Sequence, residues 1–274
     1  MIKIDVDKKT CVGDGKCIEV CPRHILKMNE KERVPEFIVG GEEICINCGH
    51  CFAFCPPGAI KLSTMDVKDS TRLDYSKLPS AEQIELFLKG RRSIRAYKDE
   101  PVAKETIEKL LDIARYAPSG INRQPVNWVI VAGKDKVHDL GGLVCKWMEG
   151  LLHAKSPMAE SLGFNSIVES WKKGKDLICR NAPCVMIAYG LKDDSMAAQS
   201  CTISTEYLEL AAFGLGLGAC WAGYVNMAIN ISEEVIKFTG LSPRASAGGV
   251  MMVGYSKYRY SRIPARNTPR VIWK

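Results

Sequence analysis

Hydrophobic and polar positions follow two different patterns along the chain. Residues 1–62 hold only short apolar stretches, broken by cysteines, prolines and glycines, and predict a small domain with a thin apolar core. Residues 63–79 are polar and lack clear periodicity, so we interpret them as a linker. Residues 80–274 hold long periodic segments and are numerous enough for a substantial core. The pattern therefore predicts two domains joined by a linker.

Helix and strand patterns alternate in residues 80–274. Ser80 and Gln83 form a capping-box sequence ahead of a helix that should end at Gly90. Apolar spacing predicts further helices at 103–116, 204–217 and 232–240, and continuous apolar runs predict buried strands at 128–133, 184–190 and 248–255. Helices between apolar strands indicate a layered domain of the α+β or α/β class.

Composition narrows the class of protein. Of 274 residues, 46% are hydrophobic and 25% charged, as in ordinary folded proteins. The first ten residues show no apolar signal segment, and the longest uncharged apolar run, 210–225, falls short of the ~20 residues that cross a bilayer. We therefore expect a soluble, cytoplasmic protein without a membrane partner. The net charge of +7 could suit nucleic acid, but no helix-turn-helix signature is present, so we expect no nucleic-acid partner.

An internal repeat organises the first domain. The segment CVGDGKCIEVCPRHILK, starting at Cys11, matches CINCGHCFAFCPPGAIK, starting at Cys45, with a constant offset of 34. Two such halves indicate a small domain with approximate two-fold symmetry. Seven of the twelve cysteines fall between Cys11 and Cys55, and this density in a cytoplasmic chain indicates metal rather than disulfides.

The second half of the repeat carries a complete iron–sulfur run. Its spacing is Cys-x2-Cys-x2-Cys-x3-Cys-Pro, in which the fourth cysteine ligates the other cluster. A zinc site would favour four ligands in two pairs, which this spacing does not provide. One cluster is then predicted to bind the following four residues: Cys21, Cys45, Cys48 and Cys51.

The first half departs from that run at one position. Asp14 stands where a cysteine is expected, so the other cluster would have Cys11, Cys17 and Cys55 as thiolate ligands and Asp14 as its fourth residue. A carboxylate is a harder and less covalent ligand for iron than a thiolate. Three states are open: an Asp14-ligated [4Fe–4S] cluster, a [3Fe–4S] cluster, or a [4Fe–4S] cluster with water on one iron.

Three segments of the second domain bear groups that suit a cofactor. Arg91-Arg92-Ser93-Ile94-Arg95 follows a helix stop, and closely spaced guanidinium groups suit a phosphate. Residues 117–125 form a turn-rich loop with amide and hydroxyl groups. GLGLGACWAG, at 214–223, does not fit the dinucleotide fingerprint, and its glycines are interpreted as ending a helix and letting the backbone approach a ligand.

The first domain resembles the two-cluster bacterial ferredoxins over residues 1–62, matching seven of their eight ligands. The segments RRSIRAY, APSGINRQP, GLGLGACWAG and SRIPARNTPRVIW, in this order, resemble the nitroreductase family of FMN oxidoreductases over residues 80–274. This second resemblance implies an α+β sandwich that forms an intertwined homodimer, with FMN at each subunit interface.

The same resemblance implies the residues that bind FMN. The phosphate and ribityl positions match Arg91, Ser93 and Arg95, with Arg92 adjacent, and Arg262 matches a C-terminal phosphate-binding residue. Tyr260 stands where many members have lysine. The segment from the opposite subunit matches Pro118, Ser119, Asn122 and Gln124, and the loop whose backbone donates toward flavin N5 matches Trp221, Ala222 and Gly223. Residues 141–175 fall where the family varies its substrate lid.

The implied function is electron transfer from a low-potential donor through iron–sulfur clusters to FMN. The flavin would then pass a hydride equivalent to a small electron-poor acceptor such as a nitroaromatic or a quinone. Because the cofactor carries the chemistry, no side chain is predicted to be catalytic. Two alternatives stay open: the same cofactors used for dehalogenation, unsaturated-bond reduction or flavin cleavage, or a non-catalytic electron-transfer or redox-sensing subunit.

Overall fold

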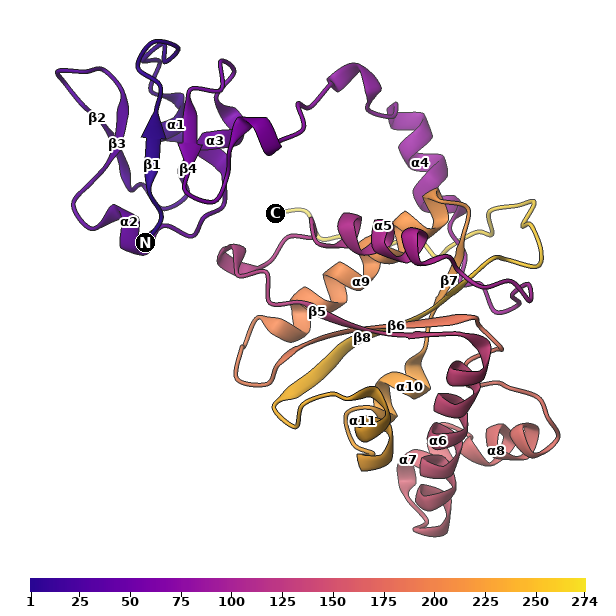
Figure 1. Ribbon diagram of the computed structural model, residues 1–274. Coiled ribbons are helices and arrows are strands. Elements are labelled where there is room, and N and C mark those ends of the chain that lie inside the picture. Colours follow the sequence, from indigo (N-terminus) through magenta and orange to yellow (C-terminus); the bar gives the residue numbers. More distant parts are fainter. The chain divides into compact units, whose positions relative to one another are not determined.

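Contacts between residues divide the chain into two units. The computed structural model describes residues 1–274. One unit comprises Met1–Leu78 together with Gly120–Arg123, and the other comprises Pro79–Ser119 together with Gln124–Lys274 (Figure 1). No helix is long and apolar enough to span a membrane.

The first unit consists of two small antiparallel ribbons and short helices. The strands are β1 (Ile4–Val6) paired with β4 (Ile60–Leu62), and β2 (Leu26–Met28) paired with β3 (Pro35–Phe37). The helices are α1 (Lys16–Glu19), α2 (Gly41–Ile44) and α3 (His50–Phe54). Helices α1 and α3 begin 34 residues apart, as do strands β2 and β4. The predicted internal repeat is thus confirmed in the backbone.

Few apolar side chains stabilise this unit. Its buried cluster consists of Cys21, Ile25 and Leu26, with a handful of half-buried neighbours. The segment predicted as a linker has local structure, because two 3-10 turns, Val67–Asp69 and Tyr75–Lys77, follow Asp66 and Asp74 as N-caps. Each aspartate accepts a hydrogen bond from the second N–H of its turn.

The second unit is built on a four-stranded antiparallel sheet. Its strand order is β5 (Asn127–Ala132), β6 (Cys184–Leu191), β8 (Ala245–Gly254) and β7 (Gly218–Trp221). Three of these strands were predicted, but β7 was interpreted as the end of a helix and a loop. A strand of four residues has too short a pattern to be recognised, and it exists because β8 pairs with it.

Helices cover the sheet on both faces and confirm the α+β class. Their bounds are α4 (Ala81–Gly90), α5 (Lys104–Ala114), α6 (Lys134–His153), α7 (Pro157–Ser161), α8 (Phe164–Lys172), α9 (Ala197–Gly214), α10 (Gly223–Ala228) and α11 (Glu233–Thr239). The predicted capping box is present, since the side chains of Ser80 and Gln83 each bond the other's backbone. Helix α9 begins ahead of the predicted start at 204.

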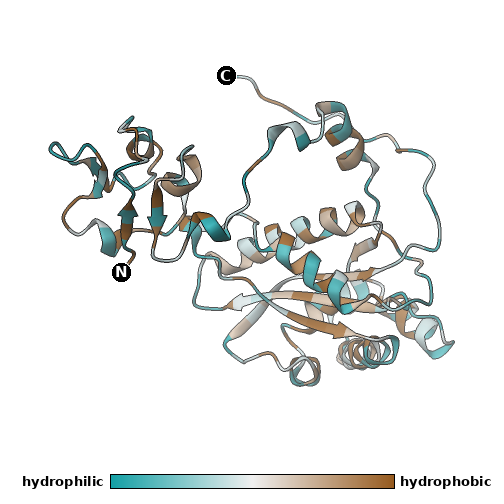
Figure 2. Cartoon of the chain, turned by 45° about the horizontal axis from the view of Figure 1, so that its top comes forward, coloured by the Kyte–Doolittle hydropathy of each residue, from teal (hydrophilic) through white to brown (hydrophobic).

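Successive side chains of the central strands point into two separate cores. Met186 and Met251 belong to the core under α5 and α9, whereas Ile187 and Val250 belong to the core under α6, α8, α10 and α11. All four side chains are fully buried. This alternation follows from the period of two along a strand. Figure 2 shows hydrophobic colour along the strands of this sheet.

The segment expected to form the variable substrate lid is packed against the core under α6, α8, α10 and α11. Residues 141–175 lie in α6, α7 and α8. Trp171 stacks on His138 and lies against Gly141, where an added Cβ would come within 2.9 Å of the indole. Phe164 is fully buried and contacts Trp147 on one side and Tyr224 on the other. Both tryptophans therefore contribute to packing in this chain.

Candidate functional site

The first unit gathers its predicted iron ligands into two sets of four. One small cavity is lined by Cys21, Cys45, Cys48 and Cys51. A second is lined by Cys11, Asp14, Cys17 and Cys55. Each set combines three residues of one half of the repeat with the last cysteine of the other half. Four sulfur or carboxylate donors around one space suit an iron–sulfur cluster.

Left-handed glycines shape the turn in each half of the repeat. Gly15 and Gly49, also 34 residues apart, have φ of 73° and 71° and precede helices α1 and α3. Such φ values are readily adopted only by glycine. At Gly49 an added Cβ would also lie 2.9 Å from the sulfur of Met65. These turns hold Asp14 and Cys48, the residues just before them, at matching places in the two halves.

Asp14 occupies the place of a cysteine and has one cationic neighbour. Its carboxylate accepts a hydrogen bond from the Lys16 backbone N–H at 3.2 Å and lies 3.5 Å from the Lys16 ammonium group. Burial raises the pKa of the Cys51 thiol to about 11 and also raises that of Cys17. Since iron binds thiolates, cluster assembly must release protons from these thiols.

The arginine run of the second unit lies along strand β7. The Ile94 N–H donates to the Ala219 carbonyl at 2.8 Å, and Ser93 forms a parallel bridge with Ala219. Gly218 permits this approach, because a Cβ there would lie 2.6 Å from the Ile94 side chain. These glycines were expected to let the backbone approach a ligand. At Gly218 the segment that lies close is the arginine run.

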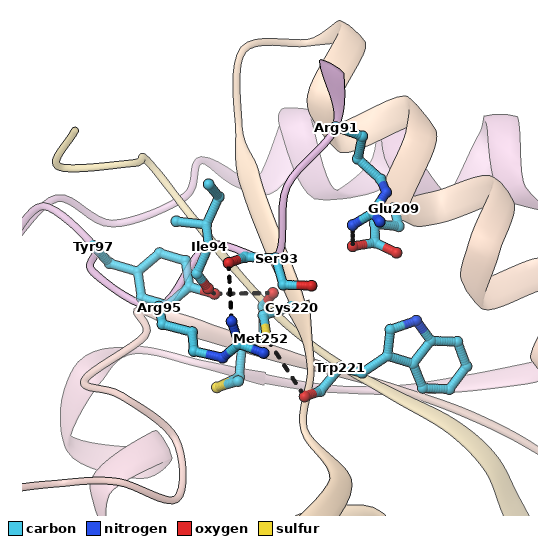
Figure 3. Close-up of polar contacts among 9 residues, drawn as sticks. All are labelled: Arg91, Ser93, Ile94, Arg95, Tyr97, Glu209, Cys220, Trp221 and Met252. Atoms are coloured by element: carbon cyan, nitrogen blue, oxygen red, sulfur yellow. Dashed lines mark hydrogen bonds and ion pairs between the residues drawn. The ribbon is translucent and has the colours of Figure 1, made fainter. Parts of the chain in front are cut away.

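Tyr97 anchors the end of the same run. Its hydroxyl donates to the Ile94 carbonyl at 2.7 Å and lies 3.5 Å from the Met252 carbonyl (Figure 3). Burial raises the pKa of Tyr97, so its hydroxyl stays protonated and available as a donor. In Figure 3 the Arg91 side chain points toward Glu209, whereas the Arg95 side chain extends toward Met252.

Two cavities of the second unit lie beside the arginine run, and Arg91 and Arg92 line the larger one. This cavity has a volume of about 910 Å³ and is also lined by Arg262, Tyr260 and Arg259, of which Arg259 was not predicted. A space of this size is typical of small-molecule sites. Four guanidinium groups in its lining suit a phosphate, which arginine binds with charge-assisted hydrogen bonds. The lining therefore fits the phosphate end of FMN.

A buried carboxylate holds one of these arginines. Arg91 Nη1 donates to Glu209 Oε1 at 2.7 Å, and the Glu209 side chain is only 3% exposed. Burial raises the pKa of Glu209, while the Arg91 charge opposes that shift. The sequence prediction missed Glu209, although it is an acidic residue between the apolar Leu208 and Leu210 in the second half of α9. That break in an apolar pattern was the signal for it.

Arg95 lines the smaller cavity of the second unit, together with the loop that was predicted to bind the flavin ring. This cavity has a volume of about 260 Å³, and Trp221 and Gly223 also line it. Gly223 is exposed, and an added Cβ would meet no atom within 4 Å. It is the first residue of α10, where backbone N–H groups lack a partner within the helix. By contrast, the buried Ala222 uses its N–H on the Val250 carbonyl at 2.8 Å.

Pro118, Ser119, Asn122 and Gln124, which were predicted to reach the FMN of the opposite subunit, line neither cavity of their own chain. The Gln124 N–H donates to the Ser119 hydroxyl at 2.9 Å, and Pro118 precedes this turn. Ile121, Asn122 and Gln124 have φ between 46° and 55°, a strained run for residues other than glycine. Within the first unit, the Asn122 amide donates to the carbonyls of Ile46 and Asn47 at 3.3 and 2.9 Å.

Two family models match the chain in separate regions. The Nitroreductase family matches residues 88–255, and the 4Fe-4S dicluster domain matches residues 10–59. The first match spans more than half of the chain and lies within the second unit except for Gly120–Arg123. The second match contains all eight predicted iron ligands, four of which line each small cavity of the first unit.

Similar proteins and structures agree with both matches. A Methanothermobacter thermautotrophicus protein, provisionally named NADH dehydrogenase/NAD(P)H nitroreductase, is 27% identical over 65% of this chain and 83% of its own. A Methanocaldococcus jannaschii ferredoxin is 33% identical over 24% of this chain and 86% of its own. A Bacteroides fragilis nitroreductase solved with bound FMN has the same fold. Its TM-score is 0.59, at 20% identity, over 70% of this chain and 99% of its own. The chain thus belongs to the nitroreductase family of oxidoreductases and carries a 4Fe-4S dicluster domain.

Proposed function

We propose that the chain is a flavin oxidoreductase whose own iron–sulfur clusters supply electrons to FMN. The observation that carries this proposal is the placement of the arginine run between two cavities. Arg91 and Arg92 line the larger cavity, and Arg95 lines the smaller one. FMN likewise has an anionic end and a flat ring end, so one molecule can use both.

In this proposal the larger cavity holds the phosphate and ribityl chain. Arg92 and Arg262 would neutralise the phosphate, and Ser93 would contact the ribityl chain from the β7 edge. Glu209 acts as a positioning residue, because its ion pair holds Arg91 in one orientation at the cavity. Nitroreductases from Bacteroides fragilis and Desulfitobacterium hafniense share this fold and were solved with bound FMN.

The smaller cavity would hold the ring of FMN. The exposed backbone of Gly223 can donate toward N5, whereas the Ala222 N–H already has a partner. Trp221 and Arg95 border the same space. Residues of this cavity would hold the ring, and bound FMN would supply the conversion of single electrons into a hydride equivalent.

Two iron–sulfur clusters complete the proposed set of cofactors. Cys21, Cys45, Cys48 and Cys51 would hold one [4Fe–4S] cluster. Cys11, Cys17 and Cys55 would hold the other, with Asp14 on its remaining iron. The position of Asp14 in the lining of that cavity supports its role as a ligand. A [3Fe–4S] cluster that leaves Asp14 unligated is the competing assignment for this site.

A homodimer would explain the exposed apolar residues of α4. Ile84, Leu86 and Leu88 are 41, 65 and 49% exposed, and no residue of this helix is buried in the single chain. Exposed apolar patches of this kind mark interaction surfaces. A second copy of the chain would cover them. It would also bring Pro118, Ser119, Asn122 and Gln124 to the FMN of the other subunit.

The proposed substrate is a small electron-poor organic acceptor of the nitroaromatic or quinone type, and the donor is a low-potential electron carrier. Two partial matches carry names that support the acceptor class. They are a 4-nitrobenzoate reductase from Nocardioides, 37% identical over 22% of this chain, and a nitrobenzene nitroreductase from Ectopseudomonas oleovorans, 33% identical over 21%.

Anaerobic purification followed by cofactor analysis tests this proposal. We expect one FMN and two iron–sulfur clusters per chain, and oxidation of the reduced protein by a nitroaromatic or quinone. Arg92→Gln should lose FMN while keeping its iron, whereas Arg115→Gln, on the surface of the same unit, should keep both. A protein that holds iron but takes up no FMN would contradict the flavin reductase proposal and favour an electron carrier.

A further inference from the structure

A second arginine, Arg180, lines the smaller cavity with Arg95. Arg180 lies in the segment before β6, far from the arginine run in sequence, and is half-buried. Leu177, Ile178, Tyr224 and Met227 supply much of the remaining lining. The cavity is thus mostly apolar, with two guanidinium groups, and this composition suits a flat, largely apolar molecule with an electron-rich edge.

A buried carboxylate holds the backbone that presents Arg180. Asp176 is 7% exposed and accepts backbone N–H hydrogen bonds from Ile178, Cys179 and Asn181, each at 2.8 Å. Arg180 and Asn181 have φ of 58° and 52°, a conformation that costs about 1–2 kcal/mol for each residue. Three hydrogen bonds to a carboxylate offset that strain, so the segment has a defined shape.

Arg180 and Arg95 line the same cavity and lack an acidic partner. Neither guanidinium forms an ion pair with a carboxylate, and the contact of Arg95 is with the Ser93 carbonyl at 3.5 Å. Burial raises the pKa of the Cys220 thiol, and the charges of Arg95 and Arg180 both oppose this shift. The two cations therefore act on the same small region, where an electron-rich group would relieve their repulsion.

We propose that Arg180 pairs with Arg95 at the N1–C2=O edge of FMN and favours the reduced form of the flavin over the oxidised form. This inference rests on the proposed function. Reduction adds electron density to that edge, so a cation beside it stabilises the reduced state more than the oxidised state. Arg180 is therefore a tuning residue, supplied by a different segment from the arginine run and held in place by Asp176.

The midpoint potential of the bound flavin tests this role in the full-length, FMN-loaded protein. Arg180→Gln should weaken binding of reduced FMN relative to oxidised FMN about tenfold. For a two-electron couple this corresponds to a potential about 30 mV lower. Arg180→Lys should retain much of the potential. Arg244→Gln is the matched control, because Arg244 pairs with Asp193 on the surface, and it should leave the potential unchanged.

Three results would overturn the assignment. A potential unchanged in an Arg180→Gln protein that holds FMN would exclude the tuning role. So would an unchanged potential with weaker binding of carboxylated acceptors only, since Arg180 would then bind the acceptor. If Arg180→Gln fails to fold, Asp176→Asn is the second variant. It keeps the positive charge of Arg180 but weakens the hydrogen bonds that hold its backbone, so the guanidinium should shift. A flavin potential unchanged in that variant would also count against the role. Failure of the wild-type protein to bind FMN would instead refute the proposed function.

Discussion

The two units of the chain are stabilised in different ways. In the second unit, a four-stranded sheet has a continuous buried core on each face, with many fully buried side chains. In the first unit, the buried cluster is two aliphatic side chains and one cysteine that is itself a predicted iron ligand, and only a few more apolar side chains are buried outside it. Small domains with so little buried apolar area depend on metal, disulfides or a partner. The twelve cysteines form no disulfide.

The free energy of folding therefore comes from different sources in the two units. The second unit buries its own apolar surface and should fold with or without cofactors. The first unit encloses two sets of metal-binding side chains with short ribbons and one-turn helices, so its folding free energy should come mainly from the clusters.

Loss of iron should unfold the first unit alone. Protein produced without iron, or the variant Cys51→Ser, should expose Met1–Leu78 to protease, because little else stabilises that unit. The second unit should remain resistant. Limited proteolysis with mass spectrometry measures both outcomes. Cys201→Ser, a buried cysteine of α9 outside the predicted ligand sets, is the matched control and should keep the first unit protected. Equal protection of an iron-free first unit would refute the comparison.

A cavity in the sheet core should weaken the second unit only. Leu208 is fully buried in α9, and Leu208→Ala should lower the free energy of unfolding by about 2–5 kcal/mol. Urea unfolding followed by tryptophan fluorescence gives this value, and the visible absorbance of the clusters should not change. Leu191→Ala, at an exposed position, should cost less than about 0.5 kcal/mol. Loss of clusters in Leu208→Ala would show that the units are not independent.

Ionisation of Glu209 should make the second unit less stable as the pH rises. The pKa of Glu209 lies above its ordinary value of 4.5. Its protonated form therefore stabilises the fold below pH 4.5, and this contribution is lost as the pH rises through the raised pKa. Glu209→Gln cannot ionise, so its stability relative to the wild-type protein should increase with pH. Urea midpoints between pH 4.5 and 8 measure the difference, and a relative decrease would show that the Arg91 ion pair outweighs burial.

Replacement of Asp14 by cysteine should alter one cluster and leave the fold intact. Asp14 lies at the position of Cys48 in the repeat, directly before a turn of the same shape. Asp14→Cys should convert any three-iron EPR signal to that of a [4Fe–4S] cluster, with little effect on unfolding. An unchanged EPR spectrum would argue that Asp14 does not ligate iron.

Local patterns predicted much of this fold. The capping box at Ser80, the strands β5, β6 and β8, and the 34-residue repeat all depend on near neighbours in the sequence, and each is confirmed. Strand β7 was missed because its hydrogen bonds come from β8 and from the arginine run, which are distant in sequence. Long-range pairing leaves little trace in a segment of four residues.

The candidate site likewise contains residues that local motifs predicted and residues that they did not. The cysteine spacing and the arginine run are local motifs, and the structure gathers these residues around four cavities, although their cofactor contacts stay predictions. Glu209 and Arg180 reach the site from distant segments, and no spacing links them to it, whereas Tyr97 ends the arginine run and contacts it through its own hydroxyl. Their roles depend on a buried ion pair, a hydroxyl contact and a carboxylate-held turn, which only the folded chain reveals.

Rapid mixing under anaerobic conditions tests the central claim, electron transfer from the clusters to FMN within one chain. The FMN-loaded protein is mixed with a low-potential reductant, and cluster and flavin absorbance are followed together. We predict that the clusters are reduced first and reoxidise as the flavin is reduced, and that Cys51→Ser slows flavin reduction at least tenfold. Clusters that stay reduced beside oxidised FMN, or flavin reduction at the same rate in Cys51→Ser, would contradict the account.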